Sequence, residues 1–446
     1  MPTIETHEAI EAVWRIESAR LIAGLTRLVG DVGLAEELAQ DALVLALEQW
    51  PTDGIPPKPG AWLMTTAKHR AIDQIRRRST LQRKHDEIGR DQALEQRIAL
   101  ADLANRADDD VGDDLLRLIF IACHPVLSRD ARIALTLRLL GGLTTDEIAH
   151  AYLVSEATIA QRIVRAKRTL TEAHVPFEVP RGADLGPRLA SVLEVVYLIF
   201  NEGYAATTGD DWMRPGLCEA ALRLGRMLAV VAPNEPEVHG LAALMEIQAS
   251  RLAARRGPGG EPVLLLDQDR RLWDQVLVRR GLSALARAER LDDSLDLPLG
   301  PYTLQAAIAA CHARARRPED TDWVRIVGLY DALAATAPSP IVELNRAVAV
   351  GMAYGPAAGL EALEPLRDDR LLSEYHLLPA VRADLLVKAG RTTEAAAEWR
   401  RAATLTKNAR ERVLLLGRAA AAAANMVDPV DPVHPVDLEG LSSPGE

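Results

Sequence analysis

The stretch Leu143–Lys167, LTTDEIAHAYLVSEATIAQRIVRAK, predicts two short helices joined by a tight turn, the second rich in cations. Thr145, or alternatively Thr144, can cap the first helix, and Ser155 can cap the second. Apolar residues recur through the stretch at the spacing of one helix face and can close a small core. These residues are Leu143, Ile148, Ala149, Val154, Ile159, Ile163 and Ala166.

The same pattern directs a set of polar side chains away from that core. Donors on the first turns of a second helix are what a helix-turn-helix presents to base edges and phosphates in the major groove. The residues that we predict to contact DNA here are Thr158, Gln161, Arg162, Arg165, Lys167 and Arg168. The competing interpretation is an ordinary helical hairpin with a solvated charged face.

A second basic segment, Trp62–Arg78 (WLMTTAKHRAIDQIRRR), predicts another helix with a cationic face. From Lys58 to Lys84 there are eight Lys or Arg residues and one acid, Asp73, a local balance of +7 in a chain of net charge −11. Alone, this segment would favour a solvated basic helix. Two cationic helices in an acidic protein instead favour a surface that binds a polyanion.

The composition favours an all-α protein. Of 446 residues 48% are hydrophobic but only 4% are aromatic, and continuous β-branched runs are scarce. The three cysteines, Cys123, Cys218 and Cys311, are far apart and match no metal spacing, which predicts a cytoplasmic protein with no metal and no cofactor. We also expect no signal segment, no membrane span and no membrane partner.

Changes in composition divide the chain into segments. We predict a helical domain over 1–84, an acidic linker over 85–114, a second helical domain over 115–173, a linker over 174–187, a helical extension over 188–424 and a disordered tail over 425–446. The acidic linker carries ten acids against three arginines. Its charge is compatible with a basic channel in a partner, with a cover over the cationic helices, or with simple solvation.

The remaining local patterns predict structure rather than chemistry. The segment Pro51–Pro59 (PTDGIPPKP) is too rich in Pro and Gly to be helical and predicts a loop. Cys123-His124-Pro125 has no second Cys/His cluster nearby, so we predict a buried cysteine followed by a turn. The acidic strings Asn201-Glu202 and Asp267–Arg270 are expected to form structural ion pairs, and no catalytic residue is predicted.

The end of the extension suggests a repeat. Turns at Asp320, Gly355 and Gly390 are 35 residues apart, and each precedes a similar helix. This period is typical of tetratricopeptide repeats, although the consensus pattern is not intact. The concave face of such a stack usually binds a peptide, a protein or a domain of the same chain.

Taken together, these segments resemble bacterial sigma factors of the extracytoplasmic-function type. Gly33–Ala42 (GLAEELAQDA) is similar to their polymerase-clamp helix, with Leu34, Leu38 and Leu45 facing inward. The resemblance implies core RNA polymerase and promoter DNA as partners. It implies polymerase contacts at Glu37, Gln40 and Asp41, and −35 contacts from the helix-turn-helix. The contacts implied for the −10 region are Trp62, Lys68, His69, Arg70, Asp73, Arg76 and Arg77.

The extension resembles a narrower group of these factors, whose members carry a tetratricopeptide-like C-terminal region. The strings that carry this likeness are Tyr197–Tyr204, Asp267–Arg270 with Trp273, Pro301–Ile308, Thr321–Trp323, Pro338–Pro340 and Leu344–Ala347. In that group the extension is thought to replace a separate anti-sigma regulator. One departure is Ala160, where many relatives carry a cation or a polar group, so Gln161 and Arg162 must carry more of the base readout.

Three hypotheses follow from different classes. The first is a sigma factor, not an enzyme, controlled by its own extension or by a protein or peptide that binds it. The second is a one-component helix-turn-helix regulator with a sensing repeat domain. The third is a scaffold or hydrolase in the C-terminal half. The clamp-helix residues separate the first from the second, and turnover by residues 188 onward would favour the third.

Overall fold

The computed structural model describes residues 4–83, 111–152, 154–206, 212–406 and 408–424, with side chains described except at 4–6, 8, 74–83 and 111–113. In these ranges every regular element is a helix, and isolated bridge residues occur at Arg256, which pairs with Pro262, and at Asn408. The predicted all-α fold is therefore confirmed. Most of the predicted acidic linker (85–110) and the tail (425–446) lie outside the described residues. The chain divides into two units, residues 1–196 and 197–446.

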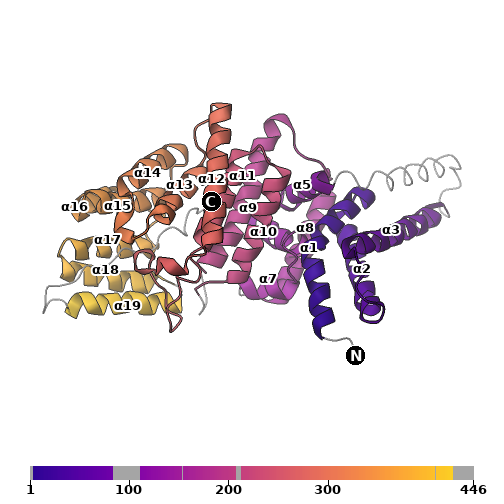
Figure 1. The fold of residues 1–446 in the computed structure, drawn as a ribbon, viewed down its shortest axis with the longest axis horizontal. Coiled ribbons are helices and arrows are strands. Elements are labelled where there is room, and N and C mark those ends of the chain that lie inside the picture. Colours follow the sequence, from indigo (N-terminus) through magenta and orange to yellow (C-terminus); the bar gives the residue numbers. More distant parts are fainter. Residues whose placement is uncertain (1–3, 84–110, 153, 207–211, 407, 425–446) are drawn as a thin grey trace. The chain divides into compact units, whose positions relative to one another are not determined.

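The first unit is built around its first helix, α1, which packs against α2, α3, α5 and α6 (Figure 1). Ile22 and Leu25 of α1 are fully buried there, and so is Leu38 of α2. The helices are α1 (Ile4–Val29), α2 (Val32–Asp53), α3 (Pro59–Arg83), α5 (Val111–Ala122), α6 (Arg129–Leu139), α7 (Thr145–Tyr152), α8 (Glu156–Glu172) and the first half of α9 (Leu185–Tyr204).

The loop predicted from Pro51 to Pro59 is shorter than expected, because α2 continues through Pro51 to Asp53. A proline in the last turn of a helix removes only one backbone hydrogen bond, so the helix tolerates it there. The helix ends at Gly54, whose φ of 83° is open to glycine at little cost and whose N–H donates to Trp50 O at 3.0 Å. Pro59 then opens α3, a position that suits its fixed φ.

The acidic linker also ends earlier than predicted, because α5 begins at Val111. Asp114, predicted as the last linker residue, is buried and accepts from Arg27 of α1 at 3.0 Å and from Arg117 at 2.7 Å. A carboxylate held by two guanidinium groups can leave water, which is why this acid belongs to the folded domain.

The second unit is a succession of helices in which most pack against the next along the chain (Figure 1). They are the end of α9, α10 (Pro215–Val231), α11 (Pro236–Ala249), α12 (Gln275–Leu295), α13 (Pro301–Arg314), α14 (Trp323–Thr336), α15 (Pro340–Tyr354), α16 (Pro356–Leu363), α17 (Leu377–Lys388), α18 (Thr392–Leu405) and α19 (Ala409–Ala424). Short 3₁₀ turns lie at Leu265–Asp267, Arg270–Leu272, Pro318–Asp320 and Glu364–Leu366.

The three turns that suggested a repeat all lie between helices. Gly355 and Gly390 have φ of 101° and 76°, and Asp320 ends the 3₁₀ turn before α14. The hairpins α14–α15, α16–α17 and α18–α19 follow these turns. The helix positions are thus as predicted, while the assignment to the tetratricopeptide class stays a prediction.

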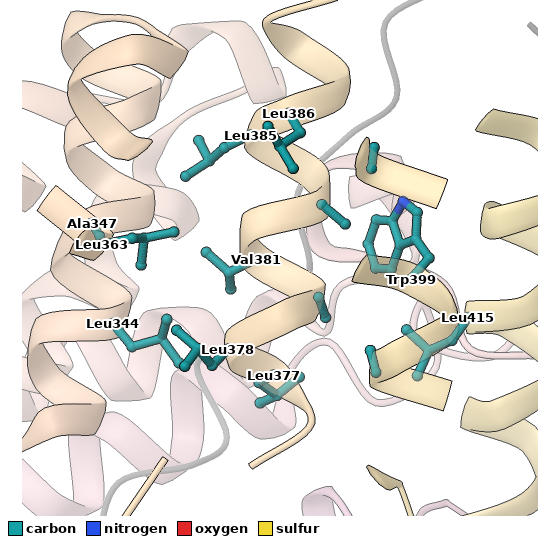
Figure 2. Close-up of a cluster of buried hydrophobic side chains, with 14 of the residues drawn as sticks. Leu344, Ala347, Leu363, Leu377, Leu378, Val381, Leu385, Leu386, Trp399 and Leu415 are labelled. Atoms are coloured by element: carbon teal, nitrogen blue, oxygen red, sulfur yellow. The ribbon is translucent and has the colours of Figure 1, made fainter. Parts of the chain in front are cut away.

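One core holds the last hairpins together. Figure 2 shows Leu344 beside Leu378 on one side of α17, and Trp399 with Leu415 on the other. Trp399 is 1% exposed and packs among alanines of α18 and α19. Each hairpin is too small to bury its apolar face alone, so α17 serves as the shared layer.

A buried acid in α12 gives a pH-dependent prediction for the second unit. Burial, followed by the carboxylates of Glu237 and Asp293, raises the pKa of Asp292 to about 6 from an ordinary 3.8. A carboxyl whose folded pKa is raised destabilises the fold once pH exceeds that value, and the cost disappears as pH falls toward the ordinary pKa. We expect Asp292→Asn to raise the melting temperature by about 2–4 °C at pH 8, the equivalent of about 1 kcal/mol, and to lose that gain near pH 4.

An exposed acid elsewhere in the second unit supplies the control for that measurement. Asp368→Asn should leave the melting temperature unchanged at both pH values, because Asp368 is exposed and does not contribute to the pKa of Asp292. A gain for Asp292→Asn that was the same at both pH values would contradict the assignment.

Candidate nucleic-acid and polymerase interface

The helix-turn-helix forms from local signals at both helix starts. Thr144, the alternative of the two predicted caps, accepts from the N–H of Glu147 at 3.1 Å, and Glu147 accepts from the N–H of Thr144 at 2.8 Å. This reciprocal pair is a capping box. Ser155 caps α8 as predicted, accepting from the N–H of Thr158 at 3.2 Å. Ile148 and Ile159 close the core between the helices.

The side chains predicted to read DNA fall into two groups. Gln161, Arg165 and Arg168 are exposed, whereas Thr158, Arg162 and Lys167 are half-buried. Arg162 pairs with Asp130 of α6 at 3.1 Å, and Arg168 pairs with Glu172 at 2.6 Å. Helix α8 therefore has an exposed face with polar and cationic side chains. Some of its cations form ion pairs with acids of the same chain.

The basic helix α3 is anchored by an aromatic pair. Trp62 packs edge-to-face on Trp50, with ring centroids 5.3 Å apart, which favours a supporting role for this tryptophan. His69 and Asp73 are exposed and Lys68 is half-buried. The side chains of Arg76 and Arg77 lie outside the described residues.

The predicted polymerase face of α2 is largely solvent-accessible. Glu37 and Asp41 are exposed and Gln40 is half-buried, while Leu34 and Leu38 are buried as predicted and Leu45 is half-buried. Asp41 pairs with Arg70 of α3 at 2.7 Å. A carboxylate predicted for the polymerase and a cation predicted for DNA are thus paired with each other.

The sequence interpretation missed Glu36, which lies beside the predicted polymerase residues but is only 4% exposed. It accepts from Arg138 Nε of α6 at 2.7 Å and from Gln40 Nε2 at 2.8 Å, and it forms an ion pair with Lys167 of α8. We call Glu36, Arg138 and Lys167 the Glu36 cluster. Its cations lie more than a hundred residues later in the chain, so no local signal indicated it.

Other contacts join the two helical domains of the first unit. Arg15 pairs with Glu147 at 3.0 Å, and Thr171 donates to Asp31 Oδ2 at 3.1 Å. Asp31 also caps α2 through its other oxygen, which accepts from Leu34 N at 2.7 Å. Together with the Glu36 cluster, these contacts hold the clamp-like helix and the recognition helix in one packed arrangement.

The first half of α9 belongs to the same unit. Arg188 donates to Phe120 O at 2.8 Å, Ser191 donates to Cys123 O at 2.9 Å, and Arg132 pairs with Glu194 at 3.3 Å. Cys123 is buried, and its burial raises the pKa of the thiol to about 11, so it is a packing residue as predicted. His124 accepts from Val126 N at 3.1 Å in the following turn.

The acidic strings of the extension also form structural contacts. Glu202 pairs with Arg214, and Asp269 accepts from Arg271 Nη2 at 2.7 Å. Across the described ranges, no three His, Cys, Asp or Glu side chains are grouped to hold a metal ion. Within those ranges no helix is both long enough and apolar enough to cross a bilayer.

This geometry shows a helix-turn-helix, a second helix with basic side chains and exposed acids on α2. Comparisons with known proteins extend this description. Residues 16–80 match the model for sigma-70 region 2, and residues 117–170 match the model for sigma-70 region 4. Residues 188–289 match a family of unknown function (DUF6596). No solved structure matches the chain significantly.

The chain is also similar in sequence to several individual proteins, two of which are described as sigma factors. An uncharacterised protein of Rhizobium meliloti (strain 1021) is 43% identical over 398 residues, which cover 87% of this chain and 90% of that protein. The probable ECF RNA polymerase sigma factor SigI of Mycobacterium tuberculosis is 27% identical over 173 residues, 39% of this chain and 58% of that protein. The ECF RNA polymerase sigma factor SigK of Mycobacterium ulcerans is 29% identical over 157 residues, 34% of this chain and 78% of that protein.

The chain therefore belongs to the sigma-70 family, as an extracytoplasmic-function sigma factor that carries a C-terminal extension. It is a transcription-initiation factor rather than an enzyme, and the family implies core RNA polymerase and promoter DNA as its partners. The region 2 match favours this identity over a one-component regulator, for which a helix-turn-helix alone would suffice.

Proposed function

We propose that this sigma factor recognises promoters through two basic helices while α2 holds the polymerase. In this proposal Thr158, Gln161, Arg162 and Arg165 enter the −35 major groove, with Lys167 and Arg168 on phosphates. The −10 region binds α3, where Lys68, Arg70, Arg76 and Arg77 neutralise phosphates. The observation that carries the proposal is the exposed, cationic outer face of the doubly capped helix hairpin.

Polymerase contact is assigned to the exposed face of α2. Glu37 and Asp41 are exposed and Gln40 is half-buried, beside the buried Leu34 and Leu38 of the same helix. Acidic side chains at the rim of an interface govern the association rate and the choice of partner more than the affinity. The proposed location is the cytoplasm, where the polymerase acts.

The packed arrangement of the first unit is proposed as a resting state. Lys167 is engaged by Glu36 and Arg70 by Asp41, so binding must exchange these intramolecular ion pairs for intermolecular ones. The half-exposed Arg70–Asp41 pair contributes about 0–1 kcal/mol and exchanges readily. Glu36 is buried and its two cations are half-buried, so in this proposal the Glu36 cluster sets the main barrier to separating the two DNA-binding domains.

The extension is proposed to control this exchange, either itself or through a protein or peptide partner. Its helices carry their own buried core, and a stack of hairpins offers a broad surface to a ligand or partner.

Start-site mapping tests the function directly. Core polymerase from the encoding organism, supplied with the purified protein, should begin RNA chains at new and defined positions on genomic DNA. A protein that joined polymerase without redirecting initiation, or did not join it, would contradict the proposal.

Truncation tests control by the extension. A cut at the predicted domain boundary, residue 173, would remove α9, which packs on α5 and α6 as far as Glu194. A stop after Val196 instead preserves the first unit. We expect this truncation to change promoter-dependent transcription by at least about tenfold in one direction, the effect of about 1.4 kcal/mol of coupling. Equal transcription by full-length and truncated protein would exclude control by the extension.

A further inference from the structure

The second unit contains a cavity of about 100 Å³ that no predicted contact uses. One side of the cavity is formed by the two segments that follow α9 and α11. The other side is formed by the helices α17, α18 and α19. Its lining residues are Ala205, Ala206, Trp212, Arg255, Pro262, Val263, Leu264, Leu377, Trp399, Asn408, Glu411, Leu414, Leu415 and Arg418.

Two arginines in the wall are held by aromatic rings. The Arg255 guanidinium lies 3.4 Å from the centroid of Tyr204, donates to Tyr204 O at 3.0 Å, and is 5% exposed. Arg418 lies 5.1 Å from the centroid of Trp399. Arg418 also forms an ion pair with Asp384 at 3.9 Å, and burial lowers the pKa of Arg418 although the charges of Asp384 and Asp267 oppose this shift. Both cations are positioned in advance of any ligand.

Asn408 adds a buried donor. Its side-chain oxygen accepts from the N–H groups of Arg410 and Glu411, at 3.1 and 3.2 Å, and so caps α19. These bonds fix the amide orientation and leave Nδ2 without a hydrogen-bond partner among the residues that the structure describes. Asn408 is 4% exposed, and a buried unsatisfied donor is costly unless a ligand or water completes it.

The acceptor on the cavity wall is already occupied. Although burial opposes it, hydrogen bonding and charge from His376 keep the pKa of Glu411 below its ordinary value. Glu411 accepts from His376 Nε2 at 2.9 Å and from the Thr406 hydroxyl. The lining thus carries two cations and one anion, and Asp384 lies beside one of the cations, Arg418.

The rest of the wall is apolar. Leu377, Trp399 and Leu415, labelled in Figure 2, belong to the core of the last hairpins and also face the cavity. Leu264 and Leu414 complete this side. An occupant must therefore combine an anionic head with a short apolar body.

We propose that this cavity binds a small aliphatic carboxylate, with its oxygens toward Asn408 and the two arginines and its alkyl group against the leucines and Trp399. The volume equals the share of about three water molecules, which suits a short-chain acid and excludes a folded segment. A carboxylate supplies the acceptors that Asn408 Nδ2 and the guanidinium groups can use. The site would make the extension a receptor for a metabolite, and its binding does not depend on the roles proposed for the DNA-binding helices.

The test uses the full-length protein, with butyrate as the probe and butyramide, its neutral analogue, as the comparison. Calorimetry should detect butyrate binding in the millimolar range or tighter, and the melting temperature should rise with butyrate but not with butyramide. Asn408→Asp keeps the oxygen that caps α19, removes the free donor and adds a repelling charge. It should weaken butyrate binding by about tenfold or more.

Asn234→Asp, the same change at an exposed turn outside the cavity, is the matched control and should bind butyrate as the unmodified protein does. The melting temperature of each variant without ligand shows that it is folded. Three results would overturn the proposal: no butyrate binding, equal binding of butyramide, or undiminished binding by folded Asn408→Asp. Tighter and competing binding of a tripeptide with a free carboxyl end would assign the site to peptide termini instead.

Discussion

Replacing Glu36 with glutamine is expected to destabilise the first unit by about 3 kcal/mol. The substitution removes the carboxylate that Arg138 and Lys167 share and leaves two partly buried cations uncompensated. Urea unfolding followed by a probe in the first unit measures this as a lower midpoint. Glu37→Gln is the control at the adjacent, exposed position and should stay within about 0.5 kcal/mol of the unmodified protein.

The same two variants should also differ in what they bind: Glu37→Gln should affect binding to polymerase, and Glu36→Gln should affect binding to DNA. Glu37→Gln is expected to slow association with core polymerase, because that carboxylate faces outward. Glu36→Gln frees Lys167, so the isolated protein should bind promoter DNA more tightly than the unmodified protein. Unchanged stability and unchanged DNA binding in Glu36→Gln would show that the packed arrangement is not a resting state.

Arg162→Ala is expected to reduce transcription from cognate promoters by about fivefold to 150-fold, the equivalent of the 1–3 kcal/mol that a bidentate base contact provides. Reconstituted transcription on cognate and altered −35 sequences measures the loss. Its half-exposed ion pair with Asp130 contributes at most about 1 kcal/mol, so the fold should persist. Polymerase binding should be intact, since that face lies on α2.

Arg165→Ala provides the contrast on the same helix. As a phosphate contact, Arg165 should support binding to any sequence equally, and its loss should reduce the slope of log affinity against log salt by about 0.9. If Arg162→Ala weakened cognate and altered sequences to the same degree, its proposed base-reading role would be wrong.

Local signals allowed the helix hairpin to be predicted from the sequence almost completely. Ser155 and the apolar spacing through Ile159 and Ile163 act within a few residues, so the sequence contains them directly. Even the choice between Thr144 and Thr145 depended on a reciprocal bond with Glu147 three residues away. The all-α class and the turns at Gly355 and Gly390 were predictable for the same reason.

Long-range charge pairs were not predictable. Glu36 lies in an amphipathic stretch of the sequence, and Asp114 lies at the end of an acidic stretch. From composition alone, acids in such stretches are expected to be exposed to solvent. Their cations come from other helices: Arg138 and Lys167 for Glu36, and Arg27 for Asp114. The cavity was missed likewise, because Arg255, Asn408 and Arg418 meet only after the chain has folded.

The division of α9 has a consequence for the ancestry of such chains. The family match to the extension begins at residue 188, yet Arg188, Ser191 and Glu194 complete the surface of the preceding domain. A recombination event at that match boundary would import a foreign helix onto α5 and α6 and break these bonds. We therefore expect related genes to exchange extensions only when the first half of α9 stays with the DNA-binding domains. The crossover would then lie near residue 197.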